Sequence, residues 1–171
     1  MSVRKIIIYG NPHLRDRARN VPNIDNDSNI VVADMRETLK YAQGLAIAAP
    51  QIDVPLRIFV ISPEFARQFK IPEVWINPEI AVGGGTALDE EGCLSIPGIY
   101  QKVPRVKTIK VKAVDLKEKP IELELNDFSA RVIQHEVDHL DGILFTDRLG
   151  LLRKIFLEPR LKKIAKNSKP L

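Results

Sequence analysis

Residues 134–142 read QHEVDHLDG, and this stretch carries the strongest indication of fold and chemistry in the sequence. His135 and His139 stand four residues apart, and Glu136 follows the first of them. On an α-helix, positions i and i+4 lie one above the other, so two imidazoles can bind one metal ion while the glutamate reaches a neighbouring water molecule. The spacing is typical of metal-assisted hydrolysis, and it requires a helix and a third ligand.

The sequence around the two histidines predicts a helix over residues 128–141. Asn126 and Asp127 are residue types that favour the N-cap, and Gly142 favours the position that follows a helix. At about 100° per residue, one side of this helix carries Ala130, Ile133, Val137 and Leu140, and the other carries Val132, His135 and His139. A helix with side chains to bury on both sides belongs in the middle of a domain, where sheets cover it.

Apolar periodicity predicts the other elements. Apolar residues repeat at helical spacing over 27–43, a capping residue stands in front, and Gly44 follows. We expect strands over 55–62, 74–80, 108–116 and 121–125, with a hairpin turn at 117–120. No repeat, low-complexity tract or interdomain linker interrupts this order.

Length and composition favour one globular unit. We expect residues 1–171 to form a single domain, since 44% hydrophobic and 28% charged residues are near the averages for such proteins. The apolar stretch near the N-terminus is too short for a signal peptide or a membrane span, so we expect a cytoplasmic protein without a membrane partner. Cys93 is the single cysteine, which excludes an internal disulfide.

Three residues compete to be the third metal ligand. His13 lacks ligand spacing, and we expect it to be a surface or packing residue. Glu158 lies 19 residues after His139, a plausible distance for the His₂Glu ligation of gluzincin-type peptidases, but it stands in a basic stretch. Cys93 is the stronger candidate, because a thiolate in a segment with Gly and Pro is a good ligand for zinc or iron. Two His and one Cys leave one position for water.

Three separated motifs resemble those of the peptide deformylase family, whose members remove the N-formyl group from nascent bacterial and organellar proteins. These motifs are GLAIAAPQ (44–51), EGCLS (91–95) and QHEVDH (134–139), and the likeness also takes in NPHLR (11–15), INPEI (76–80) and VPR (103–105). The resemblance implies an α+β fold in which mostly antiparallel β-sheets surround a central H-E-x-x-H helix. It also implies N-formyl-methionyl nascent peptides as substrates.

The resemblance assigns a role to each motif residue. Cys93, His135 and His139 correspond to the metal ligands, Glu136 to the general base, and Gln51 and the backbone N–H of Leu94 to the oxyanion donors. A bound divalent metal brings the pKa of water toward ~7, and each donor stabilises the oxyanion by about 3 kcal/mol. The resemblance favours iron(II) in the cell, while this ligand set also suits zinc, with nickel or cobalt as further possibilities.

One position departs from the family pattern. The first motif usually reads G-x-G-x-A-A-P-Q, and Ala46 stands at the second glycine. We expect its Cβ to strain the loop by about 1 kcal/mol or to narrow the cleft. The other residues that we expect to bind substrate are Gly44, Leu45, Gly92, Tyr100, Arg131 and Val132. Tyr100 and Arg131 are expected to border the methionine pocket, with Arg131 contributing only its apolar stem.

Residues 153–171 form a basic tail. This tail holds seven Lys/Arg residues and one acidic residue, Glu158, so its net charge is +6. The whole chain has a net charge of +4, so the remaining residues carry −2. Interspersed apolar residues predict an amphipathic helix that docks on the body through Leu152, Ile155, Phe156, Leu161 and Ile164. Its basic side either contacts ribosomal RNA or is an ordinary solvated face.

Two other functions compete with deformylation. The first is a gluzincin-like metallopeptidase that uses His135, His139 and Glu158. The second is an inactive relative that binds the ribosome through the basic tail, with Ala46 as a sign of lost activity. The intact set of expected ligands argues against this second alternative.

Overall fold

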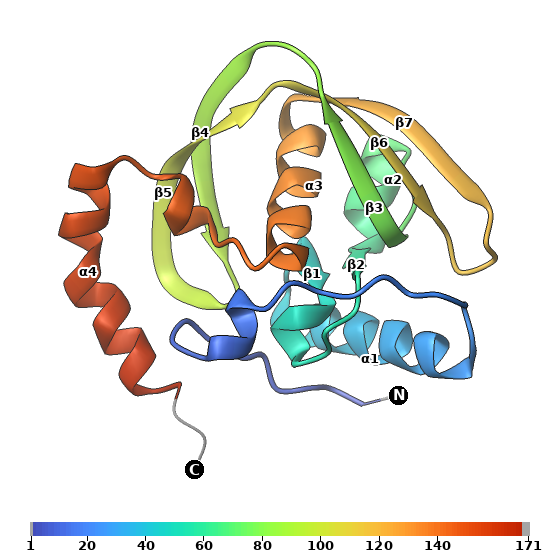
Figure 1. Ribbon diagram of the computed structural model, residues 1–171, viewed down its shortest axis with the longest axis horizontal. Helices are drawn as coiled ribbons and strands as arrows, with labels where there is room; N and C mark the ends of the chain where they lie inside the picture. The colour runs from blue at the N-terminus through green and yellow to red at the C-terminus, as the bar shows by residue number, and fades with distance from the viewer. Residues whose placement is uncertain (1, 169–171) are drawn as a thin grey trace.

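The structure is a computed structural model that describes residues 2–168 (Figure 1), so Lys169 of the basic tail lies outside the described residues. The helices are α1 (Asn26–Ala42), α2 (Pro63–Phe69), α3 (Asp127–Leu140) and α4 (Leu151–Lys166), with 3-10 turns η1 (Pro12–Arg15), η2 (Ala49–Ile52) and η3 (Phe145–Arg148). The strands are β1 (Ala46–Ala48), β2 (Ile58–Ile61), β3 (Val74–Val82), β4 (Thr86–Cys93), β5 (Ile96–Val106), β6 (Thr108–Val114) and β7 (Pro120–Asn126). Within 2–168, no helix is both long and apolar enough to cross a membrane.

The strands form two antiparallel sheets. One has five strands in the order β1-β2-β3-β6-β7, and the other is the β4–β5 hairpin. Strand β6 alternates buried Ile109 and Val111 with exposed Lys110 and Lys112, as its sequence pattern requires. Residues 115–119 form the turn that joins β6 to β7, so the predicted hairpin is confirmed and its turn lies one to two residues earlier than the expected 117–120. The α+β fold with antiparallel sheets is also confirmed.

Helix α3 stands between the five-stranded sheet and the β4–β5 hairpin (Figure 1). Its predicted apolar side, with Ala130, Ile133 and Leu140, packs in one cluster with Phe59 and Trp75 of the sheet. Its histidine-bearing side faces the hairpin. The predicted central helix with two buried sides is therefore confirmed, and the two sheets lie where they can add ligands to it.

Helix α1 leads the chain into the first motif. Asp25 caps it by accepting a hydrogen bond from the Ser28 N–H at 2.9 Å, and it ends at Gln43, which has a left-handed φ of 53°. Gly44 then passes so close to Leu39 and Leu94 that a Cβ would lie 2.8 Å and 2.9 Å from their side chains. The close approach explains why glycine opens the motif, and β1 follows it as an edge strand of the five-stranded sheet.

The structure corrects several predicted boundaries. The strand expected over 55–62 is limited to Ile58–Ile61, and that over 108–116 ends at Val114. The β4–β5 hairpin was not predicted, because β4 has no alternation of buried and exposed residues and β5 contains prolines at positions 97 and 104. Helix α2 and the short β1 were also missed.

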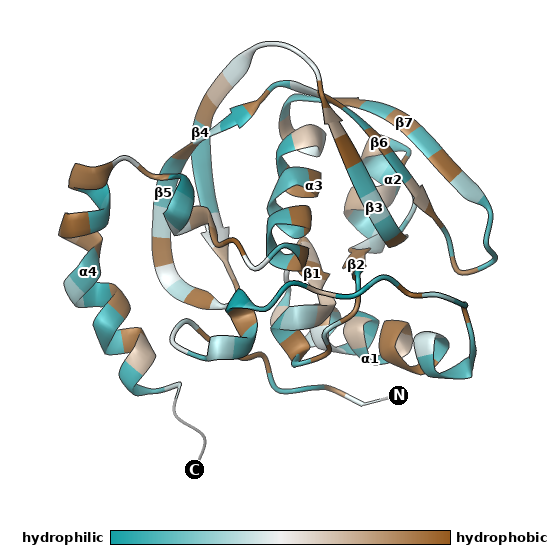
Figure 2. Cartoon of the chain, in the orientation of Figure 1, coloured by the Kyte–Doolittle hydropathy of each residue, from teal (hydrophilic) through white to brown (hydrophobic). Residues whose placement is uncertain are grey.

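The docking face of α4 differs from the prediction. Leu157 and Leu161 are buried and Ile164 packs beside them, one row at i, i+4 and i+7. Leu152, Ile155 and Phe156, which were expected to dock, are 72%, 54% and 80% exposed. Figure 2 shows brown, apolar stretches along α4. The prediction was wrong for this row because the helix carries two apolar rows, and only one faces the protein.

Candidate metal and catalytic site

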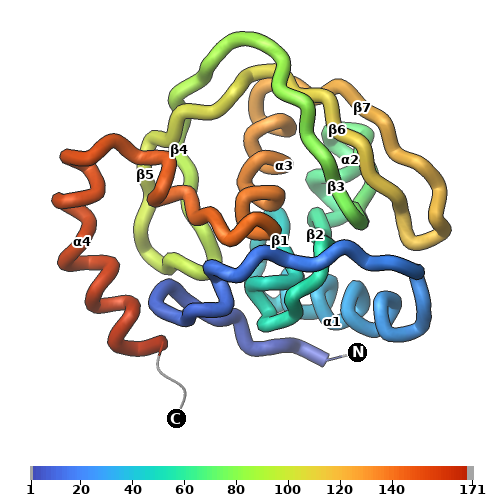
Figure 3. Tube along the Cα trace, in the orientation of Figure 1, coloured from blue at the N-terminus to red at the C-terminus, as the bar shows by residue number. Residues whose placement is uncertain are grey.

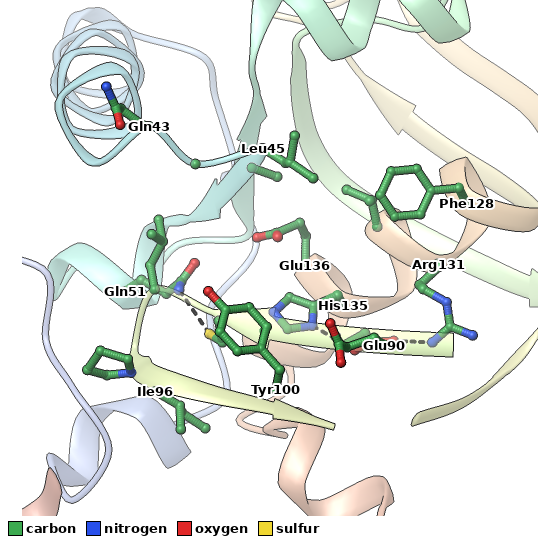
Figure 4. A pocket seen from close by; sticks show the side chains of 18 of the residues that line it. Gln43, Leu45, Gln51, Glu90, Ile96, Tyr100, Phe128, Arg131, His135 and Glu136 are labelled. Carbon is green, nitrogen blue, oxygen red and sulfur yellow. Dashed lines mark hydrogen bonds and ion pairs between the residues drawn. The ribbon is translucent and has the colours of Figure 1, made fainter. Parts of the chain in front are cut away.

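A cleft of about 540 Å³ opens between β1, the β4–β5 hairpin and α3 (Figure 4). Most of the residues singled out in the sequence line it, and they come from all three motifs. They are Gly44, Leu45, Ala46, Gln51, Gly92, Cys93, Leu94, Tyr100, Arg131, Val132, His135 and Glu136. His139 lies below the cleft surface, 1% exposed. Sequence positions up to about ninety residues apart therefore meet at one place.

Cys93, His135 and His139 form a cluster of possible metal ligands. One donor atom from each side chain lies within 4.8 Å of the others, and Sγ of Cys93 is 3.2 Å from Nε2 of His139. The two histidine rings are 5.0 Å apart between centroids, one turn of α3 from each other. Cys93 ends β4, where the register with β5 shifts. The thiol at this end of β4 lies beside the two histidines.

The other two candidate ligands lie elsewhere. Glu158 is on α4, where its carboxylate is 57% exposed and pairs with Lys162 at 2.7 Å. His13 is 59% exposed and pairs with Asp53 at 2.6 Å, in agreement with its predicted surface position. The structure therefore brings Cys93, and neither of these residues, to the H-E-x-x-H helix.

The cluster fits one divalent metal ion. A thiolate and two imidazoles are donors that zinc and iron accept, and a carboxylate lies beside them. Within residues 2–168, Glu136 Oε2 and His139 Nδ1 are buried and have no hydrogen-bond partner. A buried polar atom without a partner costs about 1–3 kcal/mol, so Glu136 is placed for a group that the protein itself does not supply. The ion would be held by Cys93, His135 and His139. It would act as a Lewis acid and lower the pKa of a bound water molecule.

Glu91 orients His135 from outside the cluster. Its Oε2 lies 3.0 Å from Nδ1 of His135, and its Oε1 accepts hydrogen bonds from Arg105 at 2.8 Å and Arg131 at 2.6 Å. Burial alone would raise the pKa of this carboxyl, but hydrogen bonds from Arg105 and His135 lower it to about 2. The anion fixes the imidazole so that Nε2 is free to bind metal.

The buried charges continue behind the helix. Asp138 accepts hydrogen bonds from Arg105 at 2.5 Å and from Arg148 at 2.5 Å. Burial tends to lower the pKa of the Arg105 guanidinium, but Glu91 and Asp138 raise it overall. These ion pairs tie α3 to β5 and η3. Glu91 and Arg105 were missed by sequence reasoning, although they lie in the EGCLS and VPR stretches quoted for the resemblance.

Arg131 fastens the hairpin to α3. Its guanidinium is 4% exposed and donates to the carbonyls of Val103 at 2.8 Å and Ala87 at 2.9 Å, in addition to Glu91. The sequence predicted that Arg131 borders the cleft, and it does. The guanidinium of Arg131 thus links β4 and β5 to α3, a structural role that the sequence periodicity did not indicate.

Gln51 and Leu94 present two amide donors near the sulfur. Oε1 of Gln51 accepts a hydrogen bond from the Ala48 N–H at 2.8 Å, and Nε2 donates to Oγ of Ser95 at 3.1 Å. Nε2 also lies 3.5 Å from Sγ of Cys93 (Figure 4). The N–H of Leu94 has no hydrogen-bond partner within residues 2–168. Ser95, the last residue of EGCLS, orients Gln51 and was missed.

The expected strain at Ala46 is absent. Ala46 pairs with Ile61 in the sheet, and its φ is not positive, so its Cβ sits in ordinary strand geometry. Gly92, like Gly44, has a steric reason to be glycine, and it pairs with Tyr100 across the hairpin. A Cβ there would lie 2.4 Å from the Tyr100 ring, which is 62% exposed at the mouth of the cleft (Figure 4).

The titrating groups suit proton transfer. Burial raises the pKa of Glu136 to about 7, against the effect of His135, so its carboxyl can take and release a proton near neutral pH. Burial and the neighbouring His135 lower the pKa of His139, which stays neutral and available as a ligand. In the metal-free protein, burial tends to lower the pKa of His135, but hydrogen bonds with Cys93 and Glu91 raise it to about 10, so a metal ion binds Nε2 by displacing a proton from this ring.

Residues 3–154 match the family described as polypeptide deformylase. The chain belongs to this family. It is a hydrolase that removes formyl groups from nascent peptides. A peptide deformylase of Aquifex aeolicus is 44% identical over 171 residues, covering 98% of this chain and 99% of that protein. One from Alkalilimnicola ehrlichii is 40% identical over 171 residues, covering 99% and 94%.

Solved deformylases have the same fold. The crystal structure of a peptide deformylase from Legionella pneumophila has a TM-score of 0.86 and 37% identity, and the match covers 99% of this chain and 100% of that one. The Thermus thermophilus enzyme has a TM-score of 0.85 and 39% identity, with 98% and 100% covered. The resemblance read from the three motifs is confirmed over nearly the whole chain.

Proposed function

We propose that the deformylase reaction of this chain is carried out by Glu136, Gln51 and Leu94 around a metal ion held by Cys93, His135 and His139. The observation that supports this most directly is the unpartnered Oε2 of Glu136, buried beside the three donor atoms. This oxygen has no hydrogen-bond partner within residues 2–168, and it lies where a water molecule would attack the substrate.

The reaction divides between these residues. Glu136 takes a proton from the attacking water molecule as the water oxygen bonds to the formyl carbon. Nε2 of Gln51 and the N–H of Leu94 donate hydrogen bonds to the formyl oxygen, which becomes negative in the transition state. Glu136 then delivers its proton to the peptide nitrogen as the C–N bond breaks. The products are formate and a free α-amine.

The cleft suits an extended peptide with an apolar first side chain. Leu45, Phe128 and Val132 offer apolar walls, and Tyr100 stands at the mouth. Strand β1 lies at the edge of its sheet, so its outer backbone groups can pair with a peptide as an added strand. We assign N-formyl-methionyl nascent peptides to this cleft, with Gly44, Ala46, Gly92 and the stem of Arg131 at its borders.

The ion is iron(II) in the cell on this proposal, and zinc, nickel or cobalt can take its place. One thiolate and two imidazoles bind each of these ions, so the ligand set alone does not choose among them. Protein loaded with each metal without oxygen, and then assayed on one formyl peptide, ranks their activities. Iron loading that gives less turnover than zinc loading would contradict the assignment of iron(II).

We place the protein in the cytoplasm, with residues 1–171 as one catalytic domain, and assign a contact with ribosomal RNA to the basic tail. Lys154, Lys163 and Lys166 are exposed on α4 and have no ion pair within residues 2–168. Backbone phosphates are suitable partners for such side chains. This contact would hold the enzyme near nascent chains.

Release of formate from formyl-Met-Ala-Ser by metal-loaded protein tests the function. We expect turnover with the formyl peptide and none with acetyl-Met-Ala-Ser. Cys93→Ser should lose metal and turnover, whereas Glu158→Gln should keep both. The opposite result for this pair would favour the gluzincin-like alternative, which the exposed position of Glu158 argues against.

A further inference from the structure

The extended segment before η1 touches both loops that carry the proposed oxyanion donors. The N–H of Ile7 donates to the carbonyl of Gln51 at 2.9 Å, and the N–H of Tyr9 donates to the carbonyl of Ser95 at 2.8 Å. Gln51 lies in η2, which follows the edge strand β1 of the five-stranded sheet, and Ser95 lies in the turn of the separate β4–β5 hairpin, next to Leu94. One short segment therefore joins the ends of two sheets. In Figure 3 it is the dark-blue start of the chain along the lower edge of the molecule.

The two hydrogen bonds fix a distance. In an extended chain, the N–H groups of residues i and i+2 point to the same side and lie about 7 Å apart. This spacing holds the Gln51 and Ser95 carbonyls at a set separation as long as the backbone dihedrals of the segment stay extended. The hydrogen bond from the Gln51 side chain to Ser95 also links the two loops, but it fixes their separation less well because this side chain can rotate.

The segment is itself held firmly. The N–H of Arg4 donates to Oγ1 of Thr38 on α1 at 2.8 Å. Ile7 is 9% exposed, in a buried cluster that also contains Ile96 and Leu161, and Tyr9 and Cys93 pack against this cluster. Ile8 lies between the two donors, and its N–H has no partner within residues 2–168.

We infer that the backbone amides of Ile7 and Tyr9 act as a strap that positions the two oxyanion donors relative to each other. Ile7 and Tyr9 are positioning residues, since neither touches the reacting atoms. The inference rests on the proposed roles of Gln51 and Leu94. Small errors in the placement of a donor cost large factors in rate, so the strap contributes to turnover more than to binding.

Amide-to-ester replacement of the backbone tests the strap, because it removes one N–H and keeps every side chain. We expect replacement at Ile7 or at Tyr9 to lower kcat for formyl-Met-Ala-Ser by about 3- to 10-fold, with KM and bound metal little changed. Replacement at Ile8, which loses no hydrogen bond, is the matched control. The double replacement at Ile7 and Tyr9 should lower kcat about as much as either single one. Losing one of the two hydrogen bonds already ends the fixed separation of the two loops.

Three results decide the matter. A kcat at Ile7 and Tyr9 equal to that of the Ile8 control would overturn the strap, even if the melting temperature fell. A double replacement that costs the product of the two single factors would also overturn it, because the bonds would then act independently. Gln51→Ala separates the two proposals. Retained turnover in this variant would contradict the oxyanion role of Gln51 and the strap together. Loss of turnover in this variant, with unchanged kcat in the ester-containing proteins, would contradict the strap alone.

Discussion

Oε2 of Glu91 lies 3.0 Å from Nδ1 of His135, so a buried anion from the second sheet orients a ring on the central helix. The same carboxylate binds Arg105 and Arg131, which hold it in place from two directions. The orientation of the proposed metal ligand is therefore set by three residues that do not reach the cluster themselves.

Glu91→Gln should weaken metal binding by about 10- to 100-fold, because a neutral amide holds the imidazole less firmly and makes it a poorer donor. Competition with a chelator measures this affinity. Glu90→Gln is the matched control, since Glu90 is the neighbouring residue, is exposed and forms no ion pair within residues 2–168. Equal affinity in the two variants would remove Glu91 from the metal site.

The low pKa of Glu91 predicts a dependence of stability on pH in metal-free protein. The pKa falls from 4.5 in the unfolded chain to about 2 in the folded one, so the folded state binds the proton less well. The resulting stability is fully present above pH 4.5 and is lost as pH falls toward 2. Urea unfolding across this range should show a shallower pH slope in Glu91→Gln than in the parent. Parallel slopes would contradict a depressed pKa.

Glu136→Ala should keep its metal and lose turnover by roughly 10²-fold or more, because the base is removed while the ligands stay. Metal analysis and formate release from one preparation give both quantities. Loss of metal in this variant would show that Glu136 is a ligand, and unchanged turnover would show that another group takes the proton.

The predicted site residues that the structure brings together are those that interact locally or stand in a recognisable motif. His135, Glu136 and His139 lie within two turns of one helix, so their spacing alone indicates a shared task. Cys93 needed its motif as well, since nothing near it in sequence shows that it meets α3. The Glu91, Arg105 and Asp138 pairings span 14 to 33 residues and cannot be read from periodicity.

The fold was predictable where one face of an element is buried. Helices α1 and α3 and strands β6 and β7 have clear patterns, and each appears within a few residues of its expected bounds. The β4–β5 hairpin borders an open cleft and exposes half of β4, so its hydrophobic pattern is lost. In α4 the pattern shows two apolar rows, and tertiary packing decides which one is buried.

Cys93 should react slowly with an alkylating reagent in metal-loaded protein and quickly after chelation, because a coordinated thiolate is a poor nucleophile. The measurement is the rate of iodoacetamide addition in the two states, followed by mass. Cys93 is the single cysteine, so every added group reports this site. Equal rates in both states would show that the thiol does not bind the metal.

Ribosome binding through α4 should weaken steeply as salt rises, since each phosphate contact releases counterions. Replacing Lys154, Lys163 and Lys166 with Gln should lower the slope of log K against log salt by about two to three units. Phe156→Ser with Leu152→Ser is the matched control, because it changes the exposed apolar row and no charge.

Truncation after Lys163 keeps Leu157 and Leu161, which dock the helix, and should weaken ribosome binding while a short formyl peptide is still processed. Binding that responds neither to salt nor to these changes would leave the basic tail as a solvated face.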